Sequence, residues 1–131
     1  MYTGVPNMMS TFGYINASWT LRADLVAHYL CRILNHMDEV GATRCTPQLR
    51  PDDASMTARP WIADFPAGYM ERSMHLFPKQ GDRAPWTNPQ DYLLERKDFR
   101  EGPIDDGCLQ FDSGPMIPAS APAQELAVAG S

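Results

Sequence analysis

Prolines limit the secondary structure that this chain can form. Twelve of them recur between Pro6 and Pro122, which is many for a chain of 131 residues. Proline lacks a backbone N–H and its ring clashes with the preceding helical turn, so it is disfavoured inside helices and in central strands. Long helices therefore fit only in the few gaps between prolines, and we expect one loop-rich domain.

The composition is that of an ordinary globular protein, and it excludes several functional classes. The formal net charge is −5, and no run of Lys or Arg could follow a phosphate backbone, so we expect no nucleic-acid partner. No stretch reaches the roughly 18 to 20 apolar residues of a transmembrane segment, and residues 1–10 lack the features of a signal peptide. We therefore expect a cytoplasmic protein. Its three cysteines are an odd number and widely spread, which predicts reduced thiols.

One long amphipathic helix is predicted over residues 20–37. On a helical wheel its apolar residues share one broad arc, which we expect to be buried. These residues are Ala23, Leu25, Val26, Ala27, Tyr29, Leu30, Ile33, Leu34 and Met37. The opposite side, expected to face solvent, carries Asp24, His28, Arg32, Asn35 and Asp38. Gly41 is predicted to end the helix in the left-handed conformation.

Strands and irregular segments are predicted on both sides of this helix. A short buried strand is expected over residues 8–12, ended by Gly13. Residues 45–60 are polar and punctuated by proline, which favours an irregular connection. Residues 104–111 are expected to form a turn followed by a short strand, and residues 114–131, rich in Pro, Ala and Ser, a flexible tail.

Two further helices are predicted in the second half of the chain. The first covers residues 67–76 and is stopped by Pro78. The second covers residues 89–100, with Asn88 as its N-cap, a proline at its first position and Asp91 three residues after the cap. The residues between the two helices are expected to form a turn segment.

The sequence carries no self-contained catalytic signature. It lacks GxGxxG, GKS or GKT, HExxH, GxSxG and CxxC. His28, Cys31 and His36 share the long helix and are of types that bind zinc, but no second pair closes a tetrahedral site, so we expect a solvated face there. Asp105 and Asp106 could serve as paired acid and base groups; because a glycine follows them, the sequence favours a turn.

The three tryptophans and one arginine also stand out. Trp19, Trp61 and Trp86 are each expected to be buried in the core or in an interface. Arg22 lies in the first turn of the long helix, where a positive charge forfeits roughly 0.3 to 1 kcal/mol. Two interpretations stay open for Arg22: a solvated side chain, or one that faces a group outside this chain.

Three segments resemble one enzyme family, in order along the chain. They are VPNMMSTFGYINASWTLRADLVAHYLCRILNHM, PKQGDRAPW and IDDGCLQF. Together they resemble the C-terminal part of class B flavin-containing monooxygenases, in the Baeyer–Villiger-type branch that includes ethionamide-activating enzymes. The resemblance implies an α/β parent fold with two dinucleotide-binding domains, of which this chain is a loop-rich, mainly helical α+β piece.

The resemblance implies a division of the chain and an activity for the whole enzyme. Residues 1–41 would end the FAD-binding domain, residues 42–113 would form a C-terminal extension packed on that domain, and residues 114–131 would be the tail. In the family, NADPH reduces FAD, O2 adds to give a C4a-peroxyflavin, and this oxidises a ketone, an aldehyde or a sulfur atom. The glycine-rich turns that bind FAD and NADP are absent here, so we expect the chain to be inactive without the rest of the enzyme.

The resemblance also assigns site residues around the start of the long helix. In the family this helix points its N-terminus at the flavin ring, where unpaired N–H groups would stabilise negative charge. The predicted cofactor-binding residues, which match the flavin-facing turn and a usually basic position, are Asn16, Ala17, Ser18 and Arg22. The predicted residues at the edge of the substrate pocket are Tyr14, Ile15 and Trp19. No catalytic residue and no metal ligand is predicted in this chain.

Three hypotheses about the chain itself stay open. It is a portion of a monooxygenase, or a shortened homologue or docking module that completes a separate flavoprotein chain, or a remnant without activity. The first hypothesis predicts that the apolar arc of the 20–37 helix lacks enough partners within this chain.

Overall fold

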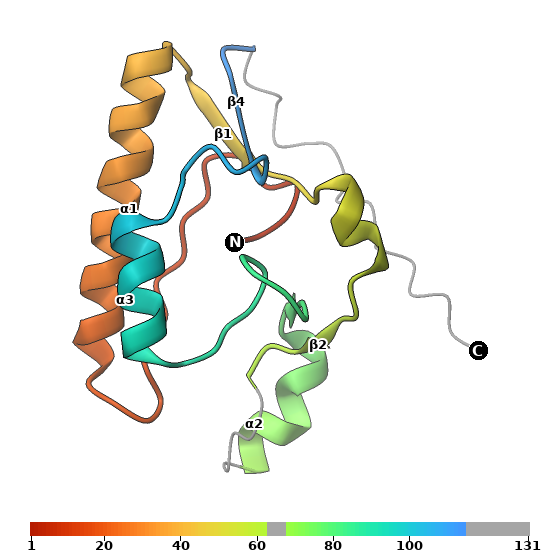
Figure 1. Ribbon diagram of the computed structural model, residues 1–131. Helices are drawn as coiled ribbons and strands as arrows, with labels where there is room; N and C mark the ends of the chain where they lie inside the picture. The colour runs from red at the N-terminus through yellow and green to blue at the C-terminus, as the bar shows by residue number, and fades with distance from the viewer. Residues whose placement is uncertain (63–67, 115–131) are drawn as a thin grey trace.

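The structure, a computed structural model, describes residues 1–62 and 68–114 (Figure 1). Its elements follow in the order α1 (Trp19–Val40), β1 (Arg44–Pro47), the 3₁₀ helix η1 (Pro51–Ser55), β2 (Arg59–Pro60), α2 (Gly68–Ser73), the 3₁₀ helix η2 (Met74–Leu76), β3 (Lys79–Gln80), α3 (Tyr92–Glu101) and β4 (Leu109–Asp112). The described residues form a small, loop-rich α+β arrangement, as predicted. The parent fold and the division at residues 41 and 113 stay predictions, and the predicted tail lies outside the described residues apart from Gly114.

The helix α1 contains the whole of the predicted 20–37 helix. It ends at Gly41, whose φ of 66° is left-handed. The N–H groups of Gly41 and Ala42 donate to carbonyls of the last turn, at 3.3 and 2.9 Å, which is the pattern of a Schellman cap. The predicted helix and its glycine terminus are therefore confirmed.

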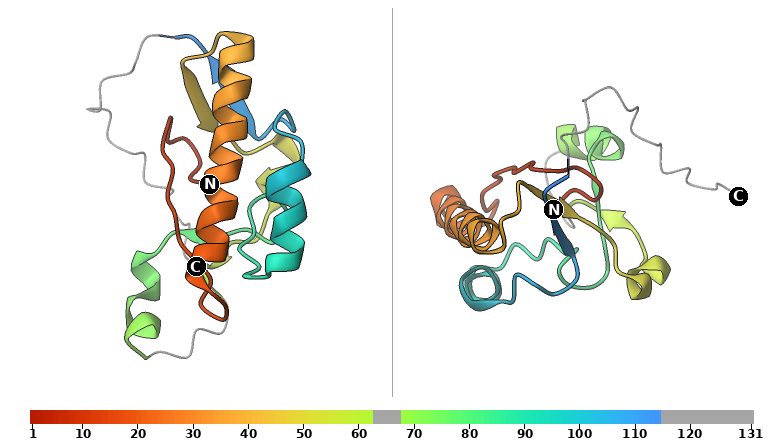
Figure 2. Two further views of the ribbon diagram at one scale, coloured as in Figure 1. Left: turned by 90° about the vertical axis from the view of Figure 1, so that its left-hand side faces the viewer. Right: turned by 90° about the horizontal axis from the view of Figure 1, so that it is seen from above.

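The helix α3 lies alongside α1, as both views of Figure 2 show, and the colours of Figure 1 show that the two helices run in the same direction. Arg22 near the start of α1 contacts Glu95 in the first half of α3, and further along the Tyr29 and Phe99 rings meet edge to face at 5.5 Å. These contacts make the α1–α3 pair the main helix packing of the described residues.

The prediction of a wide buried face on α1 is wrong in part. Within α1, all of whose residues are described, Leu25 alone is buried, while Ala27 is exposed and Leu34 is 48% exposed. The reason is that α3 covers only a narrow stripe of α1. Arg32, expected to face solvent, instead donates to the Phe99 carbonyl at 2.8 Å and helps to join the two helices.

Two small antiparallel sheets complete the described residues. The strands β1 and β4 pair with Cys45 opposite Phe111, and β2 pairs with β3 with Arg59 opposite Gln80. The short strand predicted to follow a turn within residues 104–111 is confirmed as β4. The prediction of an irregular connection over residues 45–60 is wrong. This segment contains most of β1, whose residues there are buried, as well as the helix η1 and the short strand β2.

The predicted buried strand over residues 8–12 is also wrong. The chain before it bonds to β1 at two points: the Gly4 N–H donates to the Pro47 carbonyl at 2.8 Å and the Asn7 N–H to the Cys45 carbonyl at 2.9 Å. Residues 3–4 and 6–7 form turns, and the φ of Asn7 is 52°, a left-handed conformation that does not lead into a strand. Residues 8–11 are exposed as a result.

The other two predicted helices differ in how well they match. The helix expected over residues 67–76 is present as α2 followed by η2, over its described residues. The helix expected from residue 89 begins only at Tyr92, so the Asn88 cap is wrong. Gln90 has a φ of 56°, which a helix cannot include, and the cap is Asp91, whose side chain accepts the N–H groups of the next two helical residues beyond Tyr92.

The described core is small. Its buried apolar residues are Tyr14, Leu25, Cys45, Ile62, Trp86, Cys108 and Leu109. Trp86 is buried as expected, and Trp61 is half-buried and stacked on Phe77 at 5.5 Å. Trp19 is 50% exposed within this chain, contrary to burial in its own core. Among the described residues, no helix is long and apolar enough to cross a membrane.

Candidate functional site

The predicted site residues lie together on an exposed bend that leads into α1. The chain is buried at Gly13 and Tyr14, bends over residues 15–17 and reaches the helix N-cap at Ser18. Ile15 and the three residues after it are all exposed. We refer to residues 15–18 as the bend, because they form one continuous exposed surface ahead of the helix.

The start of α1 has neither an acidic residue of its own nor a capping side chain. No acidic residue lies in its first turn, and Ser18 makes no side-chain cap; its hydroxyl pairs instead with that of Thr20 at 2.9 Å. The first N–H groups of a helix lack internal partners and carry partial positive charge. The start of α1 can therefore donate hydrogen bonds to an electron-rich group.

The tryptophan at the start of α1 depends on a glycine. A Cβ atom added at Gly13 would lie 2.1 Å from Cγ of Trp19, far inside contact distance. Trp19 therefore covers the Gly13 backbone with one part of its ring while the rest stays open to solvent. This arrangement fixes the ring beside the bend.

Arg22 is not a solvated side chain. Its side chain is 11% exposed, and its Nε and Nη2 donate to Oε1 of Glu95 at 3.1 and 2.6 Å. Its Nη1 donates to the Phe12 carbonyl at 3.2 Å, and its guanidinium lies 5.8 Å from the centre of the Tyr14 ring. The solvated interpretation is wrong; contact with a cofactor stays a prediction.

Sequence reasoning missed two buried polar residues around the start of α3. Glu95 is buried between the aromatic residues Tyr92 and Phe99, three before and four after it on the same helix face. That spacing was a usable signal, because a carboxylate inside an aromatic stripe needs a buried partner. Gln90 is buried as well, and its left-handed φ gave no signal in the sequence.

Tyr14 lies behind the bend with an unsatisfied hydroxyl. Within the described residues, the Tyr14 hydroxyl and Oε2 of Glu95 are buried without a hydrogen-bond partner. Burial raises the pKa of Tyr14 well above its ordinary value, and the adjacent Glu95 carboxylate raises it further. Tyr14 is therefore a neutral phenol at physiological pH, and it meets Tyr92 edge to face at 6.3 Å.

The other candidate groups do not join this site. Among the described residues, no set of three His, Cys, Asp or Glu side chains could hold a metal ion. His36 meets Phe111 edge to face at 4.7 Å rather than facing Cys31. Asp106 accepts the Cys108 N–H at 2.9 Å, which is the expected turn.

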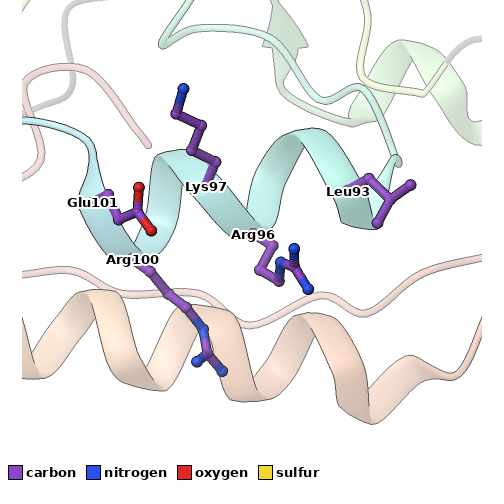
Figure 3. Close-up of a pocket in the computed structure, with 5 residues that line it drawn as sticks. All are labelled: Leu93, Arg96, Lys97, Arg100 and Glu101. Atoms are coloured by element: carbon purple, nitrogen blue, oxygen red, sulfur yellow. The ribbon is translucent and has the colours of Figure 1, made fainter.

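A depression lies along α3 (Figure 3). Its lining residues are Leu93, Arg96, Lys97, Arg100 and Glu101. All five come from one helix, so the depression has no opposing wall. Arg100 extends toward α1, where it pairs with Asp24 at 3.3 Å. We place no binding site there.

Comparison with known proteins shows which sequences this chain is similar to. No family profile and no solved structure matches the chain. The FAD-containing monooxygenase EthA of Mycolicibacterium smegmatis is 49% identical over 111 residues, which cover 85% of this chain and 22% of that protein. EthA of Mycobacterium tuberculosis is 45% identical over 115 residues, covering 88% of this chain and 23% of that protein. The probable FAD-binding monooxygenase AlmA of Acinetobacter baylyi is 41% identical over 112 residues, covering 86% and 22%.

The chain spans about a fifth of the length of the curated relatives that it matches, 22–23% for these three. The match covers most of this chain at an identity well above chance similarity. The chain is thus homologous to a part of the FAD-containing monooxygenases, the family that its segments resemble.

Proposed function

We propose that this chain is the C-terminal portion of an FAD- and NADPH-dependent monooxygenase and that its bend and the start of α1 complete the FAD site. The observation that supports this most directly is the exposed bend ahead of a helix start with no capping side chain and no acidic residue. Such a start suits the electron-rich ring of FAD. The homology to FAD-containing monooxygenases points to the same cofactor.

Within the proposed site, this chain binds and orients rather than reacts. Asn16, Ala17 and Ser18 would face FAD, because their small or short side chains let the backbone approach the ring. Ile15 and Trp19, both partly exposed, would line the substrate pocket and exclude water. Tyr14, also assigned to the pocket edge, lies buried behind them and would support the bend. Arg22, whose charge is paired with Glu95, would serve the FAD site by holding the backbone before the bend.

The proposed cofactors supply the chemistry. FAD, when bound, would carry out oxygen transfer with electrons from NADPH. The proposed reaction is Baeyer–Villiger oxidation of a ketone or an aldehyde, or oxygenation of a sulfur atom, with O2 and a small organic substrate, in the cytoplasm. We propose that the chain alone is inactive, because its sequence contains no glycine-rich motif for either cofactor.

A second candidate is a docking module that completes a separate flavoprotein chain. It is favoured by the large apolar side chains that the described part leaves exposed, among them Met8, Met9 and Leu34. The two candidates share the same site and differ in whether the rest of the enzyme is covalently joined.

One experiment tests both. The full 131-residue chain is joined in place of the matching segment of the M. smegmatis relative, and it is also mixed with that relative lacking the segment. We expect the joined protein to bind FAD and to consume NADPH with O2, and the chain alone to bind no flavin. Recovery of activity on mixing would favour the docking module. A joined protein that folds without FAD would contradict the proposal.

Variants of the joined protein test the assigned residues. Asn16→Ala and Trp19→Ala are expected to change substrate choice, or the share of NADPH consumption that yields oxygenated product, more than they change FAD content. Equal loss of FAD in both variants would show instead that these residues mainly maintain the fold.

A further inference from the structure

The backbone on both sides of the bend is held by side chains from the region around the start of α3. Gln90 lies two residues before that helix begins, and Glu95 lies in its first half. Both are buried. Neither the sequence resemblance nor the proposed function gives either residue a role.

The Gln90 amide pairs with the backbone on both sides of Tyr14. Its Oε1 accepts the Ile15 N–H at 3.0 Å, and its Nε2 donates to the Gly13 carbonyl at 3.4 Å. In a parallel sheet, one residue of the neighbouring strand would bond the same two backbone groups, the Gly13 carbonyl and the Ile15 N–H. The Gln90 side chain makes these two bonds where no neighbouring strand is present. The anchored Ile15 is the first residue of the bend.

Glu95 anchors the other end of the bend through Arg22. The Arg22 guanidinium is held by Oε1 of Glu95 and also donates to the Phe12 carbonyl. The side chains of Arg22 and Glu95 are 11% and 5% exposed, respectively, so they form a buried ion pair. Because Arg22 belongs to α1, the pair ties the helix after the bend to the segment before it.

We propose that Gln90 and Glu95 are positioning residues for the FAD-facing bend: Gln90 fixes the backbone where the bend begins, and Glu95 fixes the helix after it through the Arg22 side chain, so that the start of α1 meets the cofactor in one orientation. The bend itself is exposed, so burial does not fix its orientation. Bonds at its two ends do. This inference rests on the proposed function and assigns neither side chain a contact with FAD or substrate.

The test uses the joined FAD protein and the 131-residue chain. In the joined protein, Gln90→Ala is expected to leave FAD content unchanged but to alter the visible circular dichroism of the bound FAD. In the 131-residue chain, Gln90→Ala is expected to make the backbone amide hydrogen of Ile15 exchange with solvent about five- to tenfold faster than in the unmodified chain, as for the loss of one hydrogen bond. Gln90→Glu keeps the acceptor for Ile15 and loses the donor to Gly13, so it should give a partial effect. Glu95→Ala should alter the FAD spectrum in the same direction.

Gln80→Ala is the matched control. Gln80 is a half-buried amide in the short strand β3. Its Nε2 donates to the Pro60 and Trp61 carbonyls and its Oε1 accepts the Asn88 N–H, but it contacts neither Gly13 nor Ile15. It should lower the melting temperature without changing the FAD spectrum or the Ile15 exchange rate. An equal spectral change in Gln80→Ala, or none in Gln90→Ala, would overturn the positioning role. Absence of FAD from the unmutated joined protein would refute the proposed function itself, before any variant is compared.

Discussion

At the scale of single residues, the most fully bonded side chain described is Asp53 in η1. Its carboxylate accepts the backbone N–H, Nε and Nη2 of Arg50 and Nε1 of Trp86, at 2.9 to 3.1 Å. Bonding to the Arg50 side chain is the largest cause that holds the pKa of Asp53 well below its ordinary value. Asp53 thus links the 3₁₀ helix to the buried Trp86 and acts in folding rather than in the proposed site.

This cluster predicts a loss of stability in acid. A carboxyl group whose folded pKa is below its unfolded pKa contributes stability that is fully present above about pH 4 and is lost as pH falls through the folded pKa. The pKa values of Asp82 and Asp112 are lowered as well, by hydrogen bonds in each case. The urea midpoint should therefore stay constant above about pH 5 and fall steadily as the pH is lowered from about 4 toward about 2.

Asp53→Asn should lower the urea midpoint at pH 7 and flatten its dependence on pH, because the neutral amide cannot accept all of these bonds. The exposed Asp105, changed to Asn, is the control and should leave the curve near that of the unmodified chain. A steep acid dependence that persists unchanged in Asp53→Asn would show that other groups cause it.

The three cysteines should differ sharply in reactivity. Cys31 is exposed, whereas Cys45 and Cys108 are buried. Burial raises the pKa of Cys45, and burial together with the neighbouring Asp106 raises that of Cys108 to about 11. Since the thiolate is the reactive form, we expect an aromatic disulfide reagent at pH 7.5 to label one thiol quickly in the native chain and all three in urea. Fast labelling of Cys31→Ser would contradict the buried placement of the other two.

At the scale of elements, the sequence predicted correctly those helix bounds that depend on residues close together in the chain. The helix α1 and its end at Gly41 follow from apolar spacing and a glycine, both visible in sequence. The start of α3 was predicted wrongly, although Asn88 and Pro89 are good local signals for a helix start. Gln90 is bonded to the distant residues Gly13 and Ile15, and because its φ is left-handed, the helix can begin only after it. The same limit applies to the candidate site, where the bend was predicted from resemblance and its two anchors were not.

The observed cap of α3 predicts which side chain stabilises that helix. Asp91→Ala removes two capping bonds and should cost about 1 kcal/mol of unfolding free energy, while Asp91→Asn should cost much less because asparagine caps nearly as well. Urea unfolding measures both. Asp98→Ala, the same change on the exposed surface of the last turns, is the control and should be neutral or slightly stabilising. Equal costs for Asp91→Ala and Asp98→Ala would contradict the cap.

At the scale of the whole molecule, more large apolar side chains are exposed than buried among the described residues. Seven hydrophobic residues are buried, and fourteen large ones are exposed. The exposed ones include Leu21 and Leu34 on α1 and Trp19 at its start. An apolar arc with too few partners within this chain is what the hypothesis of a monooxygenase portion predicts, whereas the helical pattern by itself predicted a buried arc. The sequence pattern shows which residues of α1 are apolar. It does not show which of them α3 covers, because that depends on packing between elements that are distant in the sequence.

Trp19 offers the sharpest test of that incomplete burial. In the isolated chain its half-exposed ring should be quenched readily by acrylamide, and Trp19→Phe should remove the most readily quenched part of the fluorescence while leaving the emission of the half-buried Trp61 and the buried Trp86. In the joined FAD protein, compared with its own Trp19→Phe variant, the Trp19 emission should become resistant to acrylamide, because the pocket wall that it is proposed to form faces the rest of the enzyme and not bulk water. If Trp19 stays equally open to acrylamide in a joined protein that binds FAD, the bend does not face the cofactor site.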